Sequence, residues 1–119
     1  MTALRLISLP LHGAFEMLVG FLVMGAPVAL HMSAAAGVVG IAVGTMMVGL
    51  ALSSTGSAAD GRGSMTISAH HSFDYGLAIG LLGSAAVLGF AGDRVAAVFF
   101  AATALAQLSL NLVTKYSHR

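Results

Sequence analysis

Two short segments of the sequence each pair a histidine with a carboxylate four residues further on. His12 precedes Glu16, and His70 precedes Asp74 at the same spacing 58 positions later, in an otherwise apolar chain. Residues four apart share one face of a helix, so each histidine can reach its own carboxylate. The four side chains could therefore hydrogen-bond one another, exchange a proton or ligate a metal ion.

The residue types leave three interpretations of these pairs open. The first is structural, because buried polar groups are nearly always paired and a histidine one turn away satisfies each carboxylate. The second is a proton or cation pathway in which Glu16 or Asp74 exchanges the proton. The third is a zinc or iron site, although nothing in the spacing fixes a coordination geometry. We prefer the structural interpretation, so the sequence predicts no metal and no other cofactor.

The composition around these pairs is that of a protein embedded in lipid. Hydrophobic residues make up 58% of the 119 positions and charged residues only 8%, whereas a soluble domain carries about 25% charged residues. No charged residue occurs from Met17 to Ala59, and two further charge-free runs follow. One crossing needs about 20 apolar residues, which predicts an all-α integral membrane protein with four transmembrane helices. The expected helices are at about 11–31, 34–54, 70–91 and 94–114.

The chain reads as two copies of one helical hairpin. The 58-residue offset of the polar pairs also matches Thr45 with Thr103 without a gap. An even number of crossings separates the copies, so they should be parallel, with a pseudo-two-fold axis along the membrane normal. The two carboxylates would then lie at the same depth. The prediction is a single membrane domain over 1–119, with repeat one at about 11–54, a linker at about 55–69 and repeat two at about 70–114.

Two longer segments resemble a known family. LHGAFEMLVGFLVMGAPVAL and the returning HHSFDYGLAIGLLGSAAVLGF are similar to the bacterial SPW-repeat membrane proteins, small four-helix proteins with two copies of a two-helix unit. Each copy in that family tends to carry a small residue, a proline and an aromatic near the outer end of its leading helix. Here Ala26 and Pro27 keep the first two, Ser84 and Ala85 lack the proline, and tryptophan is absent. The resemblance implies the fold and the repeat, and it implies no activity.

The basic residues predict an orientation. Both termini and the middle loop share one side, which holds all the Lys and Arg residues except Arg94. The positive-inside rule places that side in the cytoplasm. With the bacterial resemblance, this predicts a multi-pass protein of the inner membrane. The residues that set this side are Arg5, Arg62, Lys115 and Arg119.

Two expected helices carry small residues four positions apart. Gly40 and Gly44 form one such face, and Gly76 and Gly80 form another. Small faces let helix backbones approach closely, which replaces the hydrophobic drive that is missing between helices in lipid. We therefore expect all four glycines to lie in helix–helix contacts.

The sequence carries no recognisable reaction centre. It has no cysteine, no phosphate loop, no dinucleotide fingerprint and no zinc-protease motif. A net charge of +1 gives no reason to expect nucleic acid. We expect a non-enzymatic scaffold, self-associating unit or accessory subunit, with membrane lipid, further copies or other membrane subunits as partners. The alternative is a small proton-coupled transporter or channel that uses Glu16 and Asp74.

Overall fold

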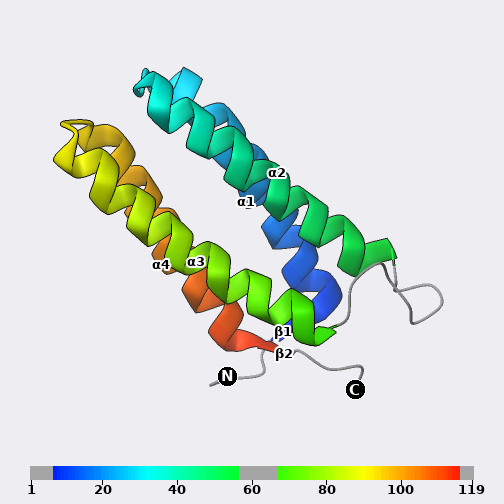
Figure 1. The fold of residues 1–119 in the computed structure, drawn as a ribbon. Helices are drawn as coiled ribbons and strands as arrows, with labels where there is room; N and C mark the ends of the chain where they lie inside the picture. Colours follow the sequence, from blue (N-terminus) through cyan, green and yellow to red (C-terminus); the bar gives the residue numbers. More distant parts are fainter. Residues whose placement is uncertain (1–6, 57–66, 116–119) are drawn as a thin grey trace.

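The structure is a computed structural model that describes residues 7–56 and 67–115, and it is a bundle of four helices (Figure 1). Each helix is long and apolar enough to span a membrane, so the chain is a multi-pass α-helical membrane protein. Every helix begins and ends within three residues of its predicted bounds. The elements are β1 (Ile7–Ser8), α1 (Leu9–Ala29), α2 (Ala34–Gly56), α3 (Ile67–Phe90), α4 (Arg94–Val113) and β2 (Thr114–Lys115).

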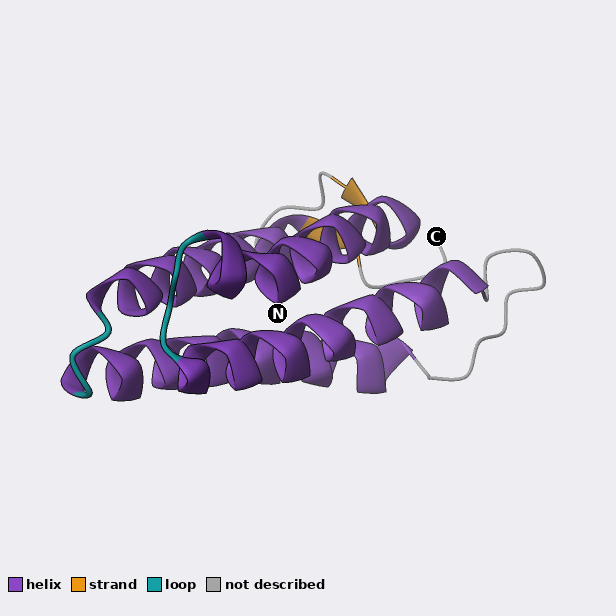
Figure 2. Cartoon of the chain, turned by 90° about the horizontal axis from the view of Figure 1, so that it is seen from above, coloured by secondary structure: helices purple, strands orange, loops and turns teal. Residues whose placement is uncertain are grey.

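The two ends of the bundle differ in structure. At one end, called here the strand end, β1 pairs in parallel with β2. At the other, the turn end, short turns join α1 to α2 and α3 to α4 (Figure 2). The predicted linker falls mostly outside the described residues, and α3 takes up its last three positions. Arg5, Arg62 and Arg119, which contribute to the expected orientation, also lie outside the described residues.

The helices pack as two hairpins. α1 packs along α2 and α3 along α4, whereas the contacts of α2 with α3 and of α1 with α4 are fewer. Both leading helices run from the strand end to the turn end, so the hairpins are parallel as predicted (Figure 1). The hairpins therefore meet through a small interface. Any polar groups that join them contribute a larger share of the free energy that holds the hairpins together than they would in a tightly packed bundle.

The two turns have the same local structure. In the first, the amide of Met32 donates to the carbonyl of Pro27 at 2.9 Å, and in the second the amide of Asp93 donates to that of Leu88 at 2.9 Å. The residue before each donor has a positive φ, 54° at His31 and 95° at Gly92. This is the Schellman arrangement that ends many helices. Its recurrence supports the reading of the chain as two copies of one hairpin.

The trailing helices are related by an offset of 60 residues, not 58. The buried positions of α2 recur in α4 at this offset, as in Ala36 with Ala96 and Met47 with Gln107. α3 has 24 residues where α1 has 21, and the turn after α3 is one residue shorter. The gap-free match of Thr45 with Thr103 is therefore wrong by two residues, and only Thr103 is buried.

The four glycines expected in helix contacts fall into two groups. A Cβ at Gly40 would lie 2.6 Å from the carbonyl oxygen of Val23, and one at Gly44 would lie 2.6 Å from that of Gly20. These two glycines thus let α2 approach the backbone of α1. A Cβ at Gly76 or Gly80 would meet nothing within 4 Å in the described chain. Those two do not make the expected close contact within one chain, because α4 packs against a different face of α3.

Candidate functional site

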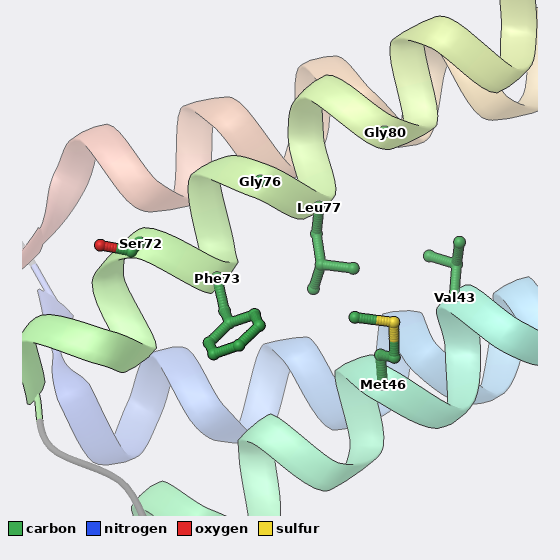
Figure 3. Close-up of a pocket in the computed structure, with 7 residues that line it drawn as sticks. All are labelled: Val43, Met46, Ser72, Phe73, Gly76, Leu77 and Gly80. Carbon is green, nitrogen blue, oxygen red and sulfur yellow. The ribbon is translucent and has the colours of Figure 1, made fainter.

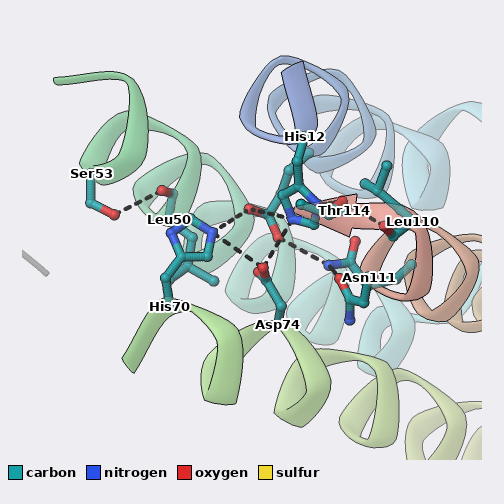
Figure 4. A network of polar contacts seen from close by, with 10 residues as sticks. His12, Leu50, Ser53, His70, Asp74, Leu110, Asn111 and Thr114 are labelled. Atoms are coloured by element: carbon teal, nitrogen blue, oxygen red, sulfur yellow. Dashed lines mark hydrogen bonds and ion pairs between the residues drawn. The ribbon is translucent and has the colours of Figure 1, made fainter. Parts of the chain in front are cut away.

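The histidine–carboxylate cluster lies inside the bundle near the strand end (Figure 4). α1 supplies its first pair and α3 its second, each on the inward face of the helix. All four side chains are at most 2% exposed. The structure thus brings together every residue that the sequence singled out for this cluster. Its members are His12, Glu16, His70 and Asp74.

Each histidine contacts the carboxylates of both repeats. His12 Nε2 lies 2.9 Å from Asp74 Oδ2 and 3.8 Å from Glu16 Oε1. His70 Nε2 lies 3.2 Å from Asp74 Oδ2 and 3.3 Å from Glu16 Oε1. The shortest of these contacts crosses from one hairpin to the other, so the cluster is a bond between the hairpins and not two separate local pairs.

A polar shell from the end of α4 and the start of β2 supports the cluster. Gln107 Nε2 donates to Glu16 Oε2 at 3.0 Å and to Asn111 Oδ1 at 3.2 Å. His12 Nδ1 lies 2.6 Å from Thr114 Oγ1. All three shell residues are buried. None of the three is among the residues predicted from the sequence, although Gln107 and Asn111, two polar residues four apart in a charge-free helix, indicate a polar inward face.

The bonds of Thr114 indicate where His12 carries a proton. The hydroxyl of Thr114 donates to the carbonyl of Leu110 at 2.6 Å, so its oxygen is left to accept a hydrogen bond. His12 Nδ1–H is then the donor, since a hydroxyl has one proton to give. This assignment leaves Nε2 as the atom that faces the carboxylates.

The charge balance of the cluster limits its chemistry. Two carboxylates in one site away from water are costly unless cations compensate them. A proton on each imidazole gives two ion pairs, whereas one divalent cation neutralises both carboxylates and leaves the imidazoles neutral. The cluster can therefore act as a buried ion-pair network or as a metal site.

A second polar link joins the hairpins at the turn end. Asp93 Oδ2 accepts from the amide of Ser33 at 2.8 Å, and Oδ1 accepts from the amide of Ala96 at 3.1 Å. The first bond crosses between hairpins, and the second caps α4. The bonds from Ser33, followed by that from Ala96, lower the pKa of the Asp93 carboxyl. The charged form of Asp93 is therefore the one that joins the hairpins at the turn end.

The other two histidines of the described residues lie outside the cluster. His71 follows a cluster residue in sequence, but its ring stacks edge-on against Tyr75 at 5.0 Å between centroids. His31 is exposed in the turn between α1 and α2. Neither belongs to the group of ligand-type side chains that converges in the described chain.

A pocket of about 440 Å³ lies between α2 and α3. Val43 and Met46 from α2 face Phe73 and Leu77 from α3 across it (Figure 3). Such a lining offers van der Waals contact and little polar recognition, so it suits an apolar chain or helix face better than a polar substrate. The other lining residues are Ser72, Gly76 and Gly80.

Comparison with protein-family models, curated proteins and solved structures finds no match to this chain.

Proposed function

We propose that this chain is a non-enzymatic scaffold of the bacterial inner membrane, of the SPW-repeat type, that self-associates through α3. The observation that carries the proposal is the open glycine face of that helix. Gly76 and Gly80 have the spacing of a close-packing face, yet an added Cβ at either would meet no other atom within 4 Å in the described chain.

The first hairpin shows how such a face is used in this fold. Gly40 and Gly44 have the same spacing, and the backbone of α1 covers both. In lipid, close backbone packing is a main source of helix association. The face at Gly76 and Gly80 has the same spacing but no helix packed closely against it in the described chain. It is therefore available to a helix outside this chain.

A second copy of the chain is the partner that we propose for this face. A two-fold contact uses the same patch on both copies, so α3 would pack against α3. Phe73 and Ile79 flank the glycines and are 48% and 72% exposed, and they would border the contact. The apolar pocket, which Gly76 and Gly80 themselves line together with residues of α2, would receive side chains of the second copy.

The links at both ends of the bundle support a scaffold. The cluster joins the hairpins at the strand end, and the hydrogen bond from the Ser33 amide to the Asp93 carboxylate joins them at the turn end. Two fixed ends would hold α3 at a constant angle and present its open face reproducibly. We place the strand end, where the described residues begin at Ile7 and end at Lys115, in the cytoplasm; terminal reporter fusions read on the periplasmic side would overturn that orientation.

Substitution of Gly80 tests self-association. In Gly80→Leu the added side chain would separate the paired helices, so we expect oligomers in the wild type and monomers in the variant, measured by native mass spectrometry from detergent. Gly25→Leu is the matched control, because its Cβ would also meet nothing within 4 Å but on α1. A wild-type chain that is monomeric, or that purifies only with other subunits, contradicts self-association.

A second candidate function, proton transport through Glu16 and Asp74, is favoured by one observation. Glu16 and Asp74 lie within helices that are long enough to span the membrane, and carboxylates at such positions often belong to proton pathways. Proteoliposomes that contain the wild type, but not Glu16→Gln, would then dissipate a pH gradient. Equal rates for both would exclude proton transport by this carboxylate.

A further inference from the structure

The four ligand-type atoms of the cluster are spaced as if around one ion. One nitrogen from each histidine and one oxygen from each carboxylate all lie within 4.8 Å of one another. The four histidine–carboxylate contacts measure 2.9, 3.2, 3.3 and 3.8 Å. A regular tetrahedron with bonds of about 2.05 Å to zinc has edges of about 3.3 Å. Four of the six edges therefore lie between 2.9 and 3.8 Å, around that value, and the other two are within 4.8 Å.

The surroundings of His12 are those of a metal-ligating histidine. Its Nδ1 donates to Thr114 Oγ1 at 2.6 Å, which leaves Nε2 directed at the carboxylates. Histidines that bind metals usually donate the other ring N–H to an oxygen, which fixes the tautomer and the ring orientation. The structure therefore contains an outer hydrogen bond as well as the four ligand atoms.

Glu16 is oriented in the same way. Its Oε1 faces the histidines, and its Oε2 accepts from the amide of Gln107 at 3.0 Å. A carboxylate held by one oxygen presents the other to an ion. The outer bonds to His12 and Glu16 come from separate residues near the end of α4, so they are independent observations.

Charge and burial favour the same conclusion. Two neutral imidazoles, two carboxylates and one divalent cation sum to zero, which suits a site with at most 2% exposure. Four protein ligands and no open position are typical of a structural zinc site. Calcium is a poorer match, because it takes six to eight oxygen ligands.

We propose that His12, Glu16, His70 and Asp74 bind one zinc-class divalent ion in tetrahedral geometry, with Thr114 and Gln107 as positioning residues. The ion would join α1 to α3 and so lock the two hairpins together at the strand end. This proposal does not depend on self-association, because all four ligands come from one chain.

Cobalt binding tests the site, because Co²⁺ replaces Zn²⁺ and absorbs strongly in the visible range when it is tetrahedral. The full chain, without a histidine tag, is purified in detergent, treated with EDTA and titrated with Co²⁺. We expect one Co²⁺ per chain with tetrahedral bands that Zn²⁺ abolishes. Glu16→Gln, which keeps the size of the side chain, should lose the bands.

Two further variants separate the metal site from a purely structural cluster. Thr114→Val keeps all four ligands but removes the outer bond to His12, together with the bond of the hydroxyl to the Leu110 carbonyl, so Co²⁺ affinity should fall about 10- to 100-fold. His71→Gln is the matched control, because His71 lies beside His70 in sequence but outside the cluster, and it should bind as the wild type does. Circular dichroism establishes that each variant is folded.

Three results would overturn the proposal. They are a wild type that takes up no more Co²⁺ than Glu16→Gln, an octahedral spectrum, and loss of binding in His71→Gln. If Glu16→Gln does not fold, the affinity of Thr114→Val decides: an unchanged value counts against the site, and a weakened one supports it.

Discussion

In the first hairpin α2 approaches the backbone of α1 at Gly40 and Gly44, whereas the positions 60 residues later hold Phe100 and Ala104. Phe100 is fully buried, so a ring fills the space in the second hairpin that close backbone contact removes in the first. One hairpin plan thus accommodates two kinds of packing. The difference shows that a small-residue spacing alone does not specify which helix will cover it.

The hairpins differ again at the strand end. Gln107 and Asn111 of the second hairpin correspond to Met47 and Ala51 of the first, and all four are buried. Both repeats therefore supply a histidine and a carboxylate to the cluster, but only the second repeat supplies side-chain amides that support it. Because Gln107 binds Glu16, the first hairpin depends on a group that only the second provides.

The largest expected effect follows from removal of a carboxylate that both hairpins share. Glu16→Leu would leave the Nε2 of His70 and the amide of Gln107 without this acceptor, and loss of one buried partner costs about 3–5 kcal/mol. Replacement of all four cluster residues by apolar ones should be milder, because no charge is then stranded. Unfolding in detergent measures both. A Glu16→Leu variant as stable as the wild type would contradict the expected dependence of both hairpins on this carboxylate.

The second prediction contrasts the covered and the open glycine faces. Gly44→Leu should lower the stability of the monomer by about 3 kcal/mol, at the upper end for overpacking, because the neighbouring atom is backbone. Gly80→Leu should leave monomer stability unchanged, since its Cβ meets nothing within 4 Å. Thermal unfolding of monomeric samples compares them. Equal losses would show that the two faces are equally packed.

The third prediction concerns the amide of Gln107, which supports Glu16. Gln107→Met introduces the residue type that the first hairpin has at this position and takes a donor from Glu16, which should cost about 1–2 kcal/mol. Leu105→Met, on the exposed side of the same helix, is the control and should change little. If the two variants unfold alike, the shell of the second hairpin does not stabilise the cluster.

The smallest expected effect concerns the turn end and depends on pH. Asp93 and Ser33 hold equivalent capping positions, but only Asp93 has a second oxygen, which accepts from the backbone amide of the other hairpin. Its pKa is lowered from the usual 3.8, so its contribution is complete above about pH 4 and is lost as the pH falls through the folded pKa.

Asp93→Ser tests this contribution, because it keeps a capping hydroxyl and lacks the second oxygen. Its stability should be lower than that of the wild type at pH 6, and the difference should shrink below about pH 4. Thermal unfolding at a series of pH values provides the measurement. A difference that is constant from pH 6 to pH 3 would mean that the Asp93 charge does not hold the turn end.

The number of helices, their approximate bounds and the parallel hairpins follow from the sequence, because charge-free length and the parity of crossings depend on local composition alone. The inward direction of each histidine–carboxylate pair follows in the same way, since a polar pair is costly against lipid. The spacing of four residues places each pair on one helix face regardless of the tertiary contacts.

Contacts between distant segments required the structure. Whether His70 reaches Glu16, 54 positions away, depends on how α1 and α3 rotate about their axes and how closely they approach, and neither quantity is encoded in local spacing. The same holds for Gln107 beside Glu16, for the open face at Gly76 and Gly80, and for the pairing of β1 with β2. Sequence periodicity determines which side of a helix is polar or small, and only the packing of all four helices determines what that side meets.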